Sequence, residues 1–252
     1  LFRSTGLSGG GLPLSDGVVI SLARMNRILD IDLENRAVTV EAGVTNLAIT
    51  RAVEDRGFYY APDPSSQLAC TIGGNIAENS GGVHCLKYGT TTNNILGVQV
   101  VLADGEVVDL GGKSMDQGGY DLLALMTGSE GLLGIITEAT VRILRKPESA
   151  RAFMAVFDSV ESTGQAVSDI IASGMVPSGM EIMDRLSIEA VEDFLGCGYP
   201  RGVEALLLVE LDGVAAEVEA RIGTLETLLR QAGATELRRA DTEEERARLW
   251  SG

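Results

Sequence analysis

The stretch from Ala61 to Gly89 constrains this chain more than any other, because it is rich in glycine and small polar residues and poor in large apolar ones. It contains a turn at 62–66, a run at 71–75 and another at 79–82. Glycine lets backbone approach a ligand closely, while Ser, Thr and Asn supply neutral donors and acceptors. The stretch therefore suits a backbone cradle, although a loop-rich connector fits its composition equally well.

Length and charge exclude several classes of protein. A chain of 252 residues with 45% hydrophobic content can bury a core in one large domain or in two ordinary ones. Its formal net charge of −16 argues against nucleic acid and anionic membranes as partners, because both require a basic face. We find no apolar run of roughly 18 residues that could span a membrane, and no signal peptide. We therefore expect a cytoplasmic protein.

The cysteines and the single histidine offer little metal chemistry. Cys70, Cys85 and Cys197 lack CxxC spacing, which favours reduced thiols over a disulfide framework or a zinc site. His84 cannot form a metal site by itself, and we interpret it as a structural residue. We expect no metal, and any mechanism that needs a histidine base has one candidate.

A second glycine-rich segment, from Ser4 to Gly11, stands at the start of the chain. Such a loop could bind a pyrophosphate through successive backbone N–H groups. The chain contains neither GxGxxG after a strand nor GxxxxGK[ST], which disfavours a plain Rossmann dehydrogenase and a P-loop enzyme.

Hydrophobic periodicity predicts a chain that mixes strands and helices. In the first half, the predicted strands are 18–22, 28–33, 36–42, 95–102, 106–110 and 135–144, and the predicted helices are 45–55 and 120–126. The Asp104-Gly105 pair predicts a hairpin between 95–102 and 106–110.

The second half alternates strands and helices more regularly. The predicted strands are 152–157, 181–183 and 205–211, and the predicted helices are 162–173, 187–195 and 214–231, with a further helix start at 243–245. This pattern predicts a small α+β domain with helices on one face of an antiparallel sheet.

Several motifs in a fixed order resemble a known family. The runs RSTGLSGG, PDPSSQ, TIGGNIAENSGGVHCLKYGT, VVLADGEVVDLGG and GSEGLLGIITEATVRILRKP resemble the FAD-binding domain of the vanillyl-alcohol-oxidase-like (PCMH-type) flavoproteins. Within that family the chain is most similar to the FAD-linked subunits of bacterial glycolate oxidases, and the likeness continues past Pro147. The resemblance implies an α+β fold, with a PCMH-type FAD-binding domain at 1–147 and a partial ferredoxin-like substrate or cap domain at 148–252.

The resemblance also implies which residues bind FAD. The first glycine loop would wrap the pyrophosphate, two segments of the central stretch would line the flavin and ribityl chain, and a later turn would meet the adenosine or ribityl portion. The implied residues are Thr5, Gly6, Leu7, Ser8, Gly9, Pro64, Ser65, Ser66, Thr71, Gly73, Gly74, Asn75, Asn79, Gly81, Gly82, Glu130, Gly134, Ile135 and Ile136. Because no histidine lies in the first loop, we expect non-covalent FAD.

By the same resemblance, the chain belongs to an enzyme that oxidises a 2-hydroxy acid, with glycolate converted to glyoxylate by hydride transfer to the flavin N5. Electrons would leave through partner subunits, including an iron–sulfur subunit, and any membrane association would pass through them. The family's His-x-Gly-Asp-Gly-Asn-x-His type motif is absent, and so is the leading Arg-Gly of its first loop. We therefore expect a chain truncated at both ends and inactive alone, with its catalytic residues unknown.

A second hypothesis is a non-catalytic module. A shortened paralogue or fragment with the same motifs could bind a nucleotide or dock to a partner through its cap. Flavin absorption by the purified protein distinguishes the two hypotheses.

Overall fold

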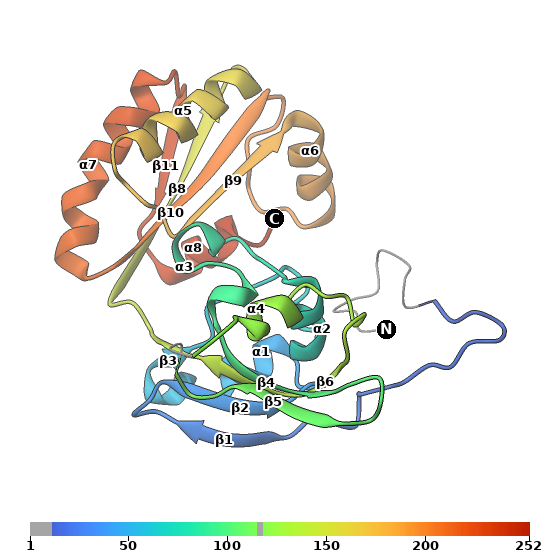
Figure 1. The fold of residues 1–252 in the computed structure, drawn as a ribbon. Helices are drawn as coiled ribbons and strands as arrows, with labels where there is room; N and C mark the ends of the chain where they lie inside the picture. The colour runs from blue at the N-terminus through green and yellow to red at the C-terminus, as the bar shows by residue number, and fades with distance from the viewer. Residues whose placement is uncertain (1–11, 115–117) are drawn as a thin grey trace. The chain divides into compact units, whose positions relative to one another are not determined.

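The computed structural model describes residues 12–114 and 118–252 (Figure 1). The chain divides into two compact units, Leu1–Lys146 and Pro147–Gly252. We call them the N-terminal unit and the C-terminal unit. Each has its own hydrophobic core.

The N-terminal unit is built on a five-stranded antiparallel sheet with the order β1-β2-β6-β4-β5. Its strands are β1 (Ile28–Asp32), β2 (Ala37–Glu41), β4 (Ile95–Val101), β5 (Val107–Gly111) and β6 (Ile135–Arg142). Two short strands, β3 (Phe58–Tyr59) and β7 (Leu144–Arg145), form a separate pair.

Alternation along these strands gives the sheet two different faces. On one face Val40 pairs with Ala139 and Ala139 with Val98, and all three are buried in the core. On the other face the next row of cross-strand pairs, Glu41, Glu138, Gln99 and Asp109, is polar. One face therefore supplies the core, and we call the other the open face.

Helices cover the apolar face. They are α1 (Asn46–Arg51), α2 (Ile72–Glu78) and α4 (Leu122–Met126). The unit also contains the short helix α3 (Cys85–Tyr88) and the 3₁₀ turns η1 (Glu54–Arg56) and η2 (Thr91–Asn93). Ile49 of α1, Ile72 and Ile76 of α2, and Met126 of α4 join the strands in one core. Figure 1 shows α1, α2 and α4 on the same side of the sheet.

Most predicted elements of this unit are confirmed, including the β4–β5 hairpin and the strands at 28–33, 36–42 and 135–144. The strand predicted at 18–22 is wrong. Within the described part of the chain that segment pairs with no strand, and Val18 is 90% exposed, because an apolar run alone does not provide a neighbouring strand. The helix predicted at 45–55 ends at Arg51, and Gly57 stops the following 3₁₀ turn in a left-handed conformation.

The C-terminal unit contains a four-stranded antiparallel sheet with the order β11-β8-β10-β9. Its elements in chain order are β8 (Ser149–Phe157), α5 (Val160–Ala172), β9 (Gly179–Asp184), α6 (Arg185–Phe194), β10 (Ala205–Gly213), α7 (Ala215–Gln231), β11 (Glu236–Ala240) and α8 (Glu243–Leu249). Apart from α6 and α8, this is the ferredoxin-like β-α-β-β-α-β arrangement, as predicted. Strand β11 was missed because its two arginines and one glutamate give no apolar alternation.

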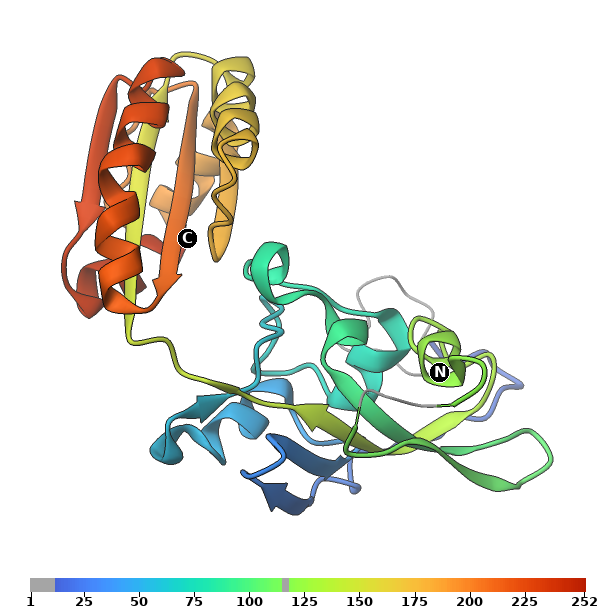
Figure 2. The same ribbon diagram turned by 60° about the vertical axis from the view of Figure 1, so that its left-hand side comes forward.

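The prediction of helices on one face of this sheet is wrong. Helices α5 and α7 pack on one face of the sheet (Figure 2). Phe153, Leu207 and Leu225 are buried there. Helices α6 and α8 contribute Ile188 and Leu249 to a second core on the other face. The strands of this sheet carry apolar side chains on both faces, so both faces must be buried by helices. Among residues 12–114 and 118–252, none of the helices combines the length and apolar character that a bilayer crossing requires.

A buried glutamate fastens α8 to the sheet. Glu210 of β10 has a side chain only 3% exposed, and its Oε2 accepts hydrogen bonds from Arg246 Nη1 at 2.9 Å and from Trp250 Nε1 at 2.7 Å. Arg246 also pairs with the exposed Glu243 at 2.6 Å. These bonds raise the pKa of Arg246, with Glu243 as the largest cause, so the guanidinium stays charged.

We predict that Glu210→Ala lowers the free energy of unfolding of the C-terminal unit by about 2–3 kcal/mol, because Trp250 loses its acceptor and Arg246 loses its buried partner. Trp250 is the only tryptophan, so urea unfolding followed by its fluorescence measures this unit. The control Glu243→Ala, at a carboxylate that is 77% exposed, should cost less than about 1 kcal/mol. Equal effects of the two changes would contradict the role given to Glu210.

Candidate functional site

The cofactor residues implied by the sequence lie on four segments. Thr5, Gly6, Leu7, Ser8 and Gly9 lie outside the described residues. The others lie in the loop at 62–66, in α2 with its N-cap, in the segment 79–82 and in the turn and strand at 130–136. All of the described segments belong to the N-terminal unit.

The start of α2 is bonded to the protein itself. Thr71 is the N-cap residue, and its Oγ1 accepts a hydrogen bond from Gly74 N at 3.4 Å. The N–H of Ile72 donates to Val44 O at 2.8 Å, and that of Gly73 donates to Ala42 O at 2.9 Å. The first N–H groups of this helix are therefore already used, and any contact here with a cofactor needs side chains or close backbone approach.

Gly73 has a packing reason to be glycine. A Cβ at this position would lie 2.8 Å from Ala42 Cβ and 3.0 Å from Ala42 O at the end of β2. Only a residue without a side chain lets α2 approach the sheet this closely.

The end of α2 joins two of the candidate segments. The N–H groups of Gly128 and Glu130 donate to Ile76 O at 2.8 Å and Ala77 O at 2.9 Å, which satisfies carbonyl groups at the helix end. Asn79 ends the helix in a left-handed conformation, with φ of 51°. The structure thus brings segment 71–82 and the turn at 128–130 together, although about 50 residues separate them in sequence.

Asn79 also anchors the chain that follows α3. Its Oδ1 accepts hydrogen bonds from Thr90 Oγ1 at 3.1 Å and Thr92 N at 2.9 Å. The side-chain acceptor of Asn79 therefore holds residues 90–92 against the end of α2.

The loops at 61–66 and 80–85 lie directly against each other. A Cβ on Gly82 would be 2.4 Å from Asp63 O, and His84 Nδ1 lies 2.5 Å from Asp63 Oδ2. His84 N also donates to Asp63 Oδ1 at 3.3 Å. Both side chains are less than a quarter exposed. The structural interpretation of His84 fits this geometry, and Asp63 is the partner that sequence reasoning missed.

A buried amide network supports the same loops. Asn75 Nδ2 donates to Asn46 Oδ1 at 2.9 Å, and Asn46 Nδ2 donates to Pro62 O at 2.8 Å. Sequence reasoning missed Asn46, whose only signal was its position after the Thr45 N-cap. Through this network α1, α2 and the loop at 62–66 are fixed relative to one another.

In α2 and the turn that caps it, two buried polar atoms have no hydrogen-bond partner among the described residues. They are Asn75 Oδ1, in α2, and Ser129 Oγ, in the turn that caps α2. A buried polar group without a partner is costly and points to an absent ligand or an ordered water. The region therefore fits a cofactor with hydroxyl or N–H groups, which FAD carries. In the same hydrophobic core as α2, burial raises the pKa of Tyr60 far above its usual value, so the phenol stays protonated.

The remaining candidate residues lead into β6. Glu130 is exposed and adopts a left-handed conformation, with φ of 54°. Gly134 lies under β4, since a Cβ there would be 2.5 Å from Val100 Cγ1. Ile135 and Ile136 pair with β4, while the β2 ladder ends at Glu138 and Ala42 N donates to Thr137 O. Pairing with β2 thus stops just before the two isoleucines.

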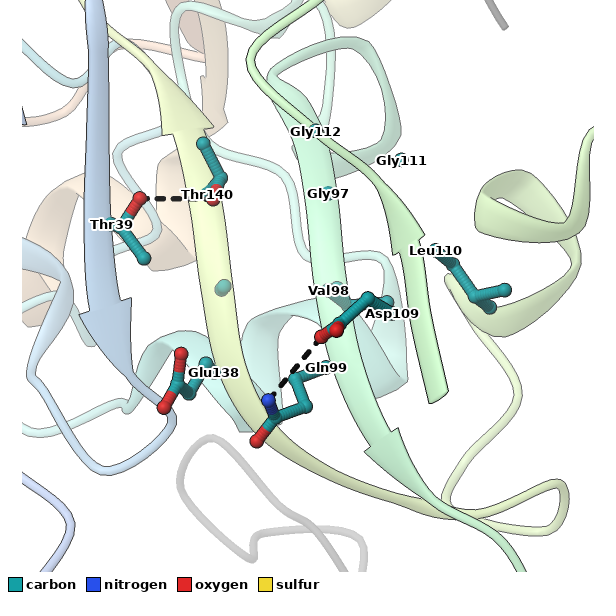
Figure 3. Close-up of a pocket in the computed structure, with 11 residues that line it drawn as sticks. Thr39, Gly97, Val98, Gln99, Asp109, Leu110, Gly111, Gly112, Glu138 and Thr140 are labelled. Atoms are coloured by element: carbon teal, nitrogen blue, oxygen red, sulfur yellow. Dashed lines mark hydrogen bonds between the residues drawn. The ribbon is translucent and has the colours of Figure 1, made fainter. Parts of the chain in front are cut away.

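The hollow on the open face is a separate feature (Figure 3). It has a volume of about 180 Å³ and lies over β2, β6, β4 and β5, with Thr39 and Thr140 bonded at 3.0 Å and Gln99 Nε2 donating to Asp109 at 3.3 Å. Ligand pockets usually reach about 300–1,000 Å³, so this hollow is too small for a dinucleotide. None of the implied cofactor residues that the structure describes lines it.

The open face is closed at one end by an ion-pair bridge. Lys113, after β5, lies 2.8 Å from Asp30 and 2.7 Å from Asp32 on β1, the strand at the opposite edge of the sheet. The hydrogen bonds raise the pKa of Lys113 to about 12, with Asp30 as the largest cause. The hydrogen bond from Asn35, followed by that from Lys113, lowers the pKa of Asp32. The segment that follows β5 is therefore tied to β1 by this side chain.

Within the described ranges no group of three or more His, Cys, Asp or Glu side chains is arranged to hold a metal ion. Cys70, Cys85 and Cys197 are free thiols.

The chain is similar to known protein families over most of its length. Residues 1–111 match the family described as FAD binding domain, and residues 146–252 match the C-terminal domain of FAD linked oxidases. The chain is 56% identical over 248 residues to glycolate oxidase subunit GlcD of Escherichia coli (strain K12), covering 98% of this chain and 50% of that protein. The chain belongs to the FAD-linked oxidases.

Two further relatives show a similar likeness. GlcD of Bacillus subtilis (strain 168) is 44% identical over 242 residues, covering 96% of this chain and 52% of the relative. A D-lactate dehydrogenase of Anaerostipes hadrus is 37% identical over 255 residues, covering 98% and 54%. The chain thus spans about half the length of these curated relatives.

Solved structures confirm the fold. A structure of alkyldihydroxyacetonephosphate synthase matches with a TM-score of 0.79 at 21% identity, covering 92% of this chain and 48% of that one. A second crystal form matches with a TM-score of 0.76, covering 90% and 44%. The two-domain α+β fold expected from the sequence, a PCMH-type FAD-binding domain followed by a ferredoxin-like domain, is thereby confirmed.

We predict that Gly82→Ala opens the contact between the loops at 61–66 and 80–85, because the new Cβ would lie 2.4 Å from Asp63 O. Such overpacking typically costs about 1–3 kcal/mol. Hydrogen–deuterium exchange of peptides that span 61–89 should rise in this variant. The control Gly112→Ala, where a Cβ meets nothing within 4 Å, should leave exchange unchanged. Unchanged exchange in Gly82→Ala would show that the two loops are not in contact.

Proposed function

We propose that this FAD-linked oxidase chain holds FAD in its N-terminal unit and takes part in the oxidation of a 2-hydroxy acid. The observation that carries this proposal is the junction around α2, where two unpartnered buried atoms, Asn75 Oδ1 and Ser129 Oγ, lie on segments joined by backbone hydrogen bonds. Asn75 lies within the part of the chain that matches the FAD binding domain. When bound, FAD supplies the hydride acceptor of such an oxidation.

The proposed roles of the residues follow their positions. Residues 5–9 would bind the pyrophosphate, and Pro64, Ser65 and Ser66 would line the flavin side. Thr71, Gly73, Gly74, Asn75, Asn79, Gly81 and Gly82 would continue that wall. Glu130, Gly134, Ile135 and Ile136 would meet the adenosine or ribityl portion. The end of β2 pairing before Ile136 supports a backbone contact at this strand. FAD would be bound without a covalent link.

Glycolate is the proposed substrate, with glyoxylate as the product. Support comes from the names of the relatives, since glycolate oxidase subunits are 56% and 44% identical and a D-lactate dehydrogenase is 37% identical. Glycolate and lactate are both 2-hydroxy acids, and the relatives named for glycolate have the higher sequence identities.

The chain is proposed to work with partner subunits. Two relatives are named as subunits of glycolate oxidase, which supports an assembly of several chains. An iron–sulfur subunit is the proposed electron acceptor, because a two-electron flavin needs an outlet for its electrons. We place the assembly in the cytoplasm, with any membrane association through the partners.

We predict that Ser129→Ala weakens FAD binding about three- to tenfold, because a neutral hydrogen bond contributes about 0.5–1.5 kcal/mol. The Ser129 hydroxyl has no partner within the described protein, so its removal should not lower the melting temperature. Titration of the apoprotein with FAD, followed by flavin fluorescence, gives the dissociation constants.

The matched control is Thr140→Val, which removes a hydroxyl from the open face of the sheet. FAD affinity should not change in this variant. Equal affinity of wild type and Ser129→Ala would remove Ser129 from the site. A colourless wild-type protein that FAD cannot reconstitute would contradict the proposed function and favour the non-catalytic module.

A further inference from the structure

A hollow of about 360 Å³ lies in the C-terminal unit, between β11, α8 and the loop that follows α6. We call it the arginine hollow, because Arg238, Arg239 and Arg248 line it together with Gly198, Glu245 and Leu249. It contains none of the residues proposed to bind FAD. The chain carries a formal net charge of −16, so a hollow with three guanidinium groups runs against its overall charge.

Arg238 is held at the hollow by a backbone contact. Its Nη1 donates to Gly198 O at 2.8 Å, and its Nη2 lies 3.4 Å from Glu236 Oε1. A guanidinium has five N–H donors, so these contacts orient the group and leave donors for a ligand. The side chain is about half exposed, at 46%, and a ligand can reach it from solvent.

Arg248 lines the hollow with a positive charge that no carboxylate of the described residues neutralises. Its Nη2 lies against Gly198, 3.0 Å from the place of a Cβ there, and Gly198 adopts a φ of 87°. Among the residues that the structure describes, no carboxylate lies within 4.0 Å of this guanidinium. Arg239, by contrast, is paired with Asp241 at 2.6 Å.

The one carboxylate that lines the hollow is engaged elsewhere. Glu245 Oε2 accepts hydrogen bonds from Asp241 N at 2.9 Å and Thr242 N at 3.1 Å, in the capping box at the start of α8. These bonds direct the carboxylate to the backbone of the helix start, where the helix dipole favours a negative charge. Glu245 therefore leaves Arg248 without a counter-ion.

We propose that the arginine hollow binds a small oxyanion, a carboxylate or a phosphate, through Arg248 and Arg238. The planar guanidinium fork matches the oxygens of both anions and binds them with charge-assisted hydrogen bonds. The volume of about 360 Å³ is within the range of small-molecule sites. This site is independent of FAD, because it uses only residues of the C-terminal unit.

The test is calorimetric titration of the chain with inorganic phosphate and, separately, with glycolate, at an ionic strength held constant with sodium chloride. At least one of the two anions should bind saturably at a single site. Arg248→Gln should weaken that binding about tenfold or more, as expected for the loss of charge-assisted hydrogen bonds. Comparing the two titrations distinguishes a phosphate site from a carboxylate site.

The matched control is Arg201→Gln, in the same unit, where the arginine already pairs with Glu189 and Asp193 at 2.8 Å. This variant should bind the anion as the wild type does. No saturable binding of either anion, or equal weakening in both variants, would overturn the proposal. Ser129→Ala should not affect anion binding, so failure of this proposal and failure of the FAD proposal give different results.

Discussion

Helix α2 is held at both ends by backbone from distant parts of the chain, and the geometry of the candidate site depends on these bonds. At its start, Gly73 N bonds to Ala42 O beside the sheet, and the absence of a Cβ allows this approach. At its end, the carbonyls of Ile76 and Ala77 accept N–H groups from the turn at 128–130. Segments that are far apart in sequence are thereby fixed around one short helix.

The two faces of the sheet explain why we propose a cofactor site on the helix side. The helices pack on the apolar side chains around Val40 and Val98. The polar side chains of the opposite face line only a small hollow. The unpartnered atoms of Asn75 and Ser129 lie on the helix side, where the Asp63–His84 pair and the amide network also fix the loops. These loops are therefore positioned by bonds within the protein itself.

Sequence patterns predict the strands because alternation survives in β2, β4 and β6, and because Asp104-Gly105 specifies the hairpin. Helix α2 is hidden in the sequence, since two glycines in seven residues oppose a helix, and tertiary bonds override that preference. The charged strand β11 forms because β8 offers it an edge. The hydrogen bond between Asn75 and Asn46 depends on proximity in the folded chain, which the spacing of residues in the sequence does not reveal. The same holds for the lack of a partner at Ser129.

The most direct measurement uses a chimera in which this chain replaces the 248 matching residues of GlcD from Escherichia coli. The chimera is purified with FAD, and the visible flavin absorption is followed under anaerobic conditions after glycolate is added. Our account predicts that the chimera retains FAD and that glycolate bleaches its flavin band, with GlcD itself treated in parallel as the control. A folded chimera that binds no FAD, or whose flavin glycolate does not reduce, would contradict it.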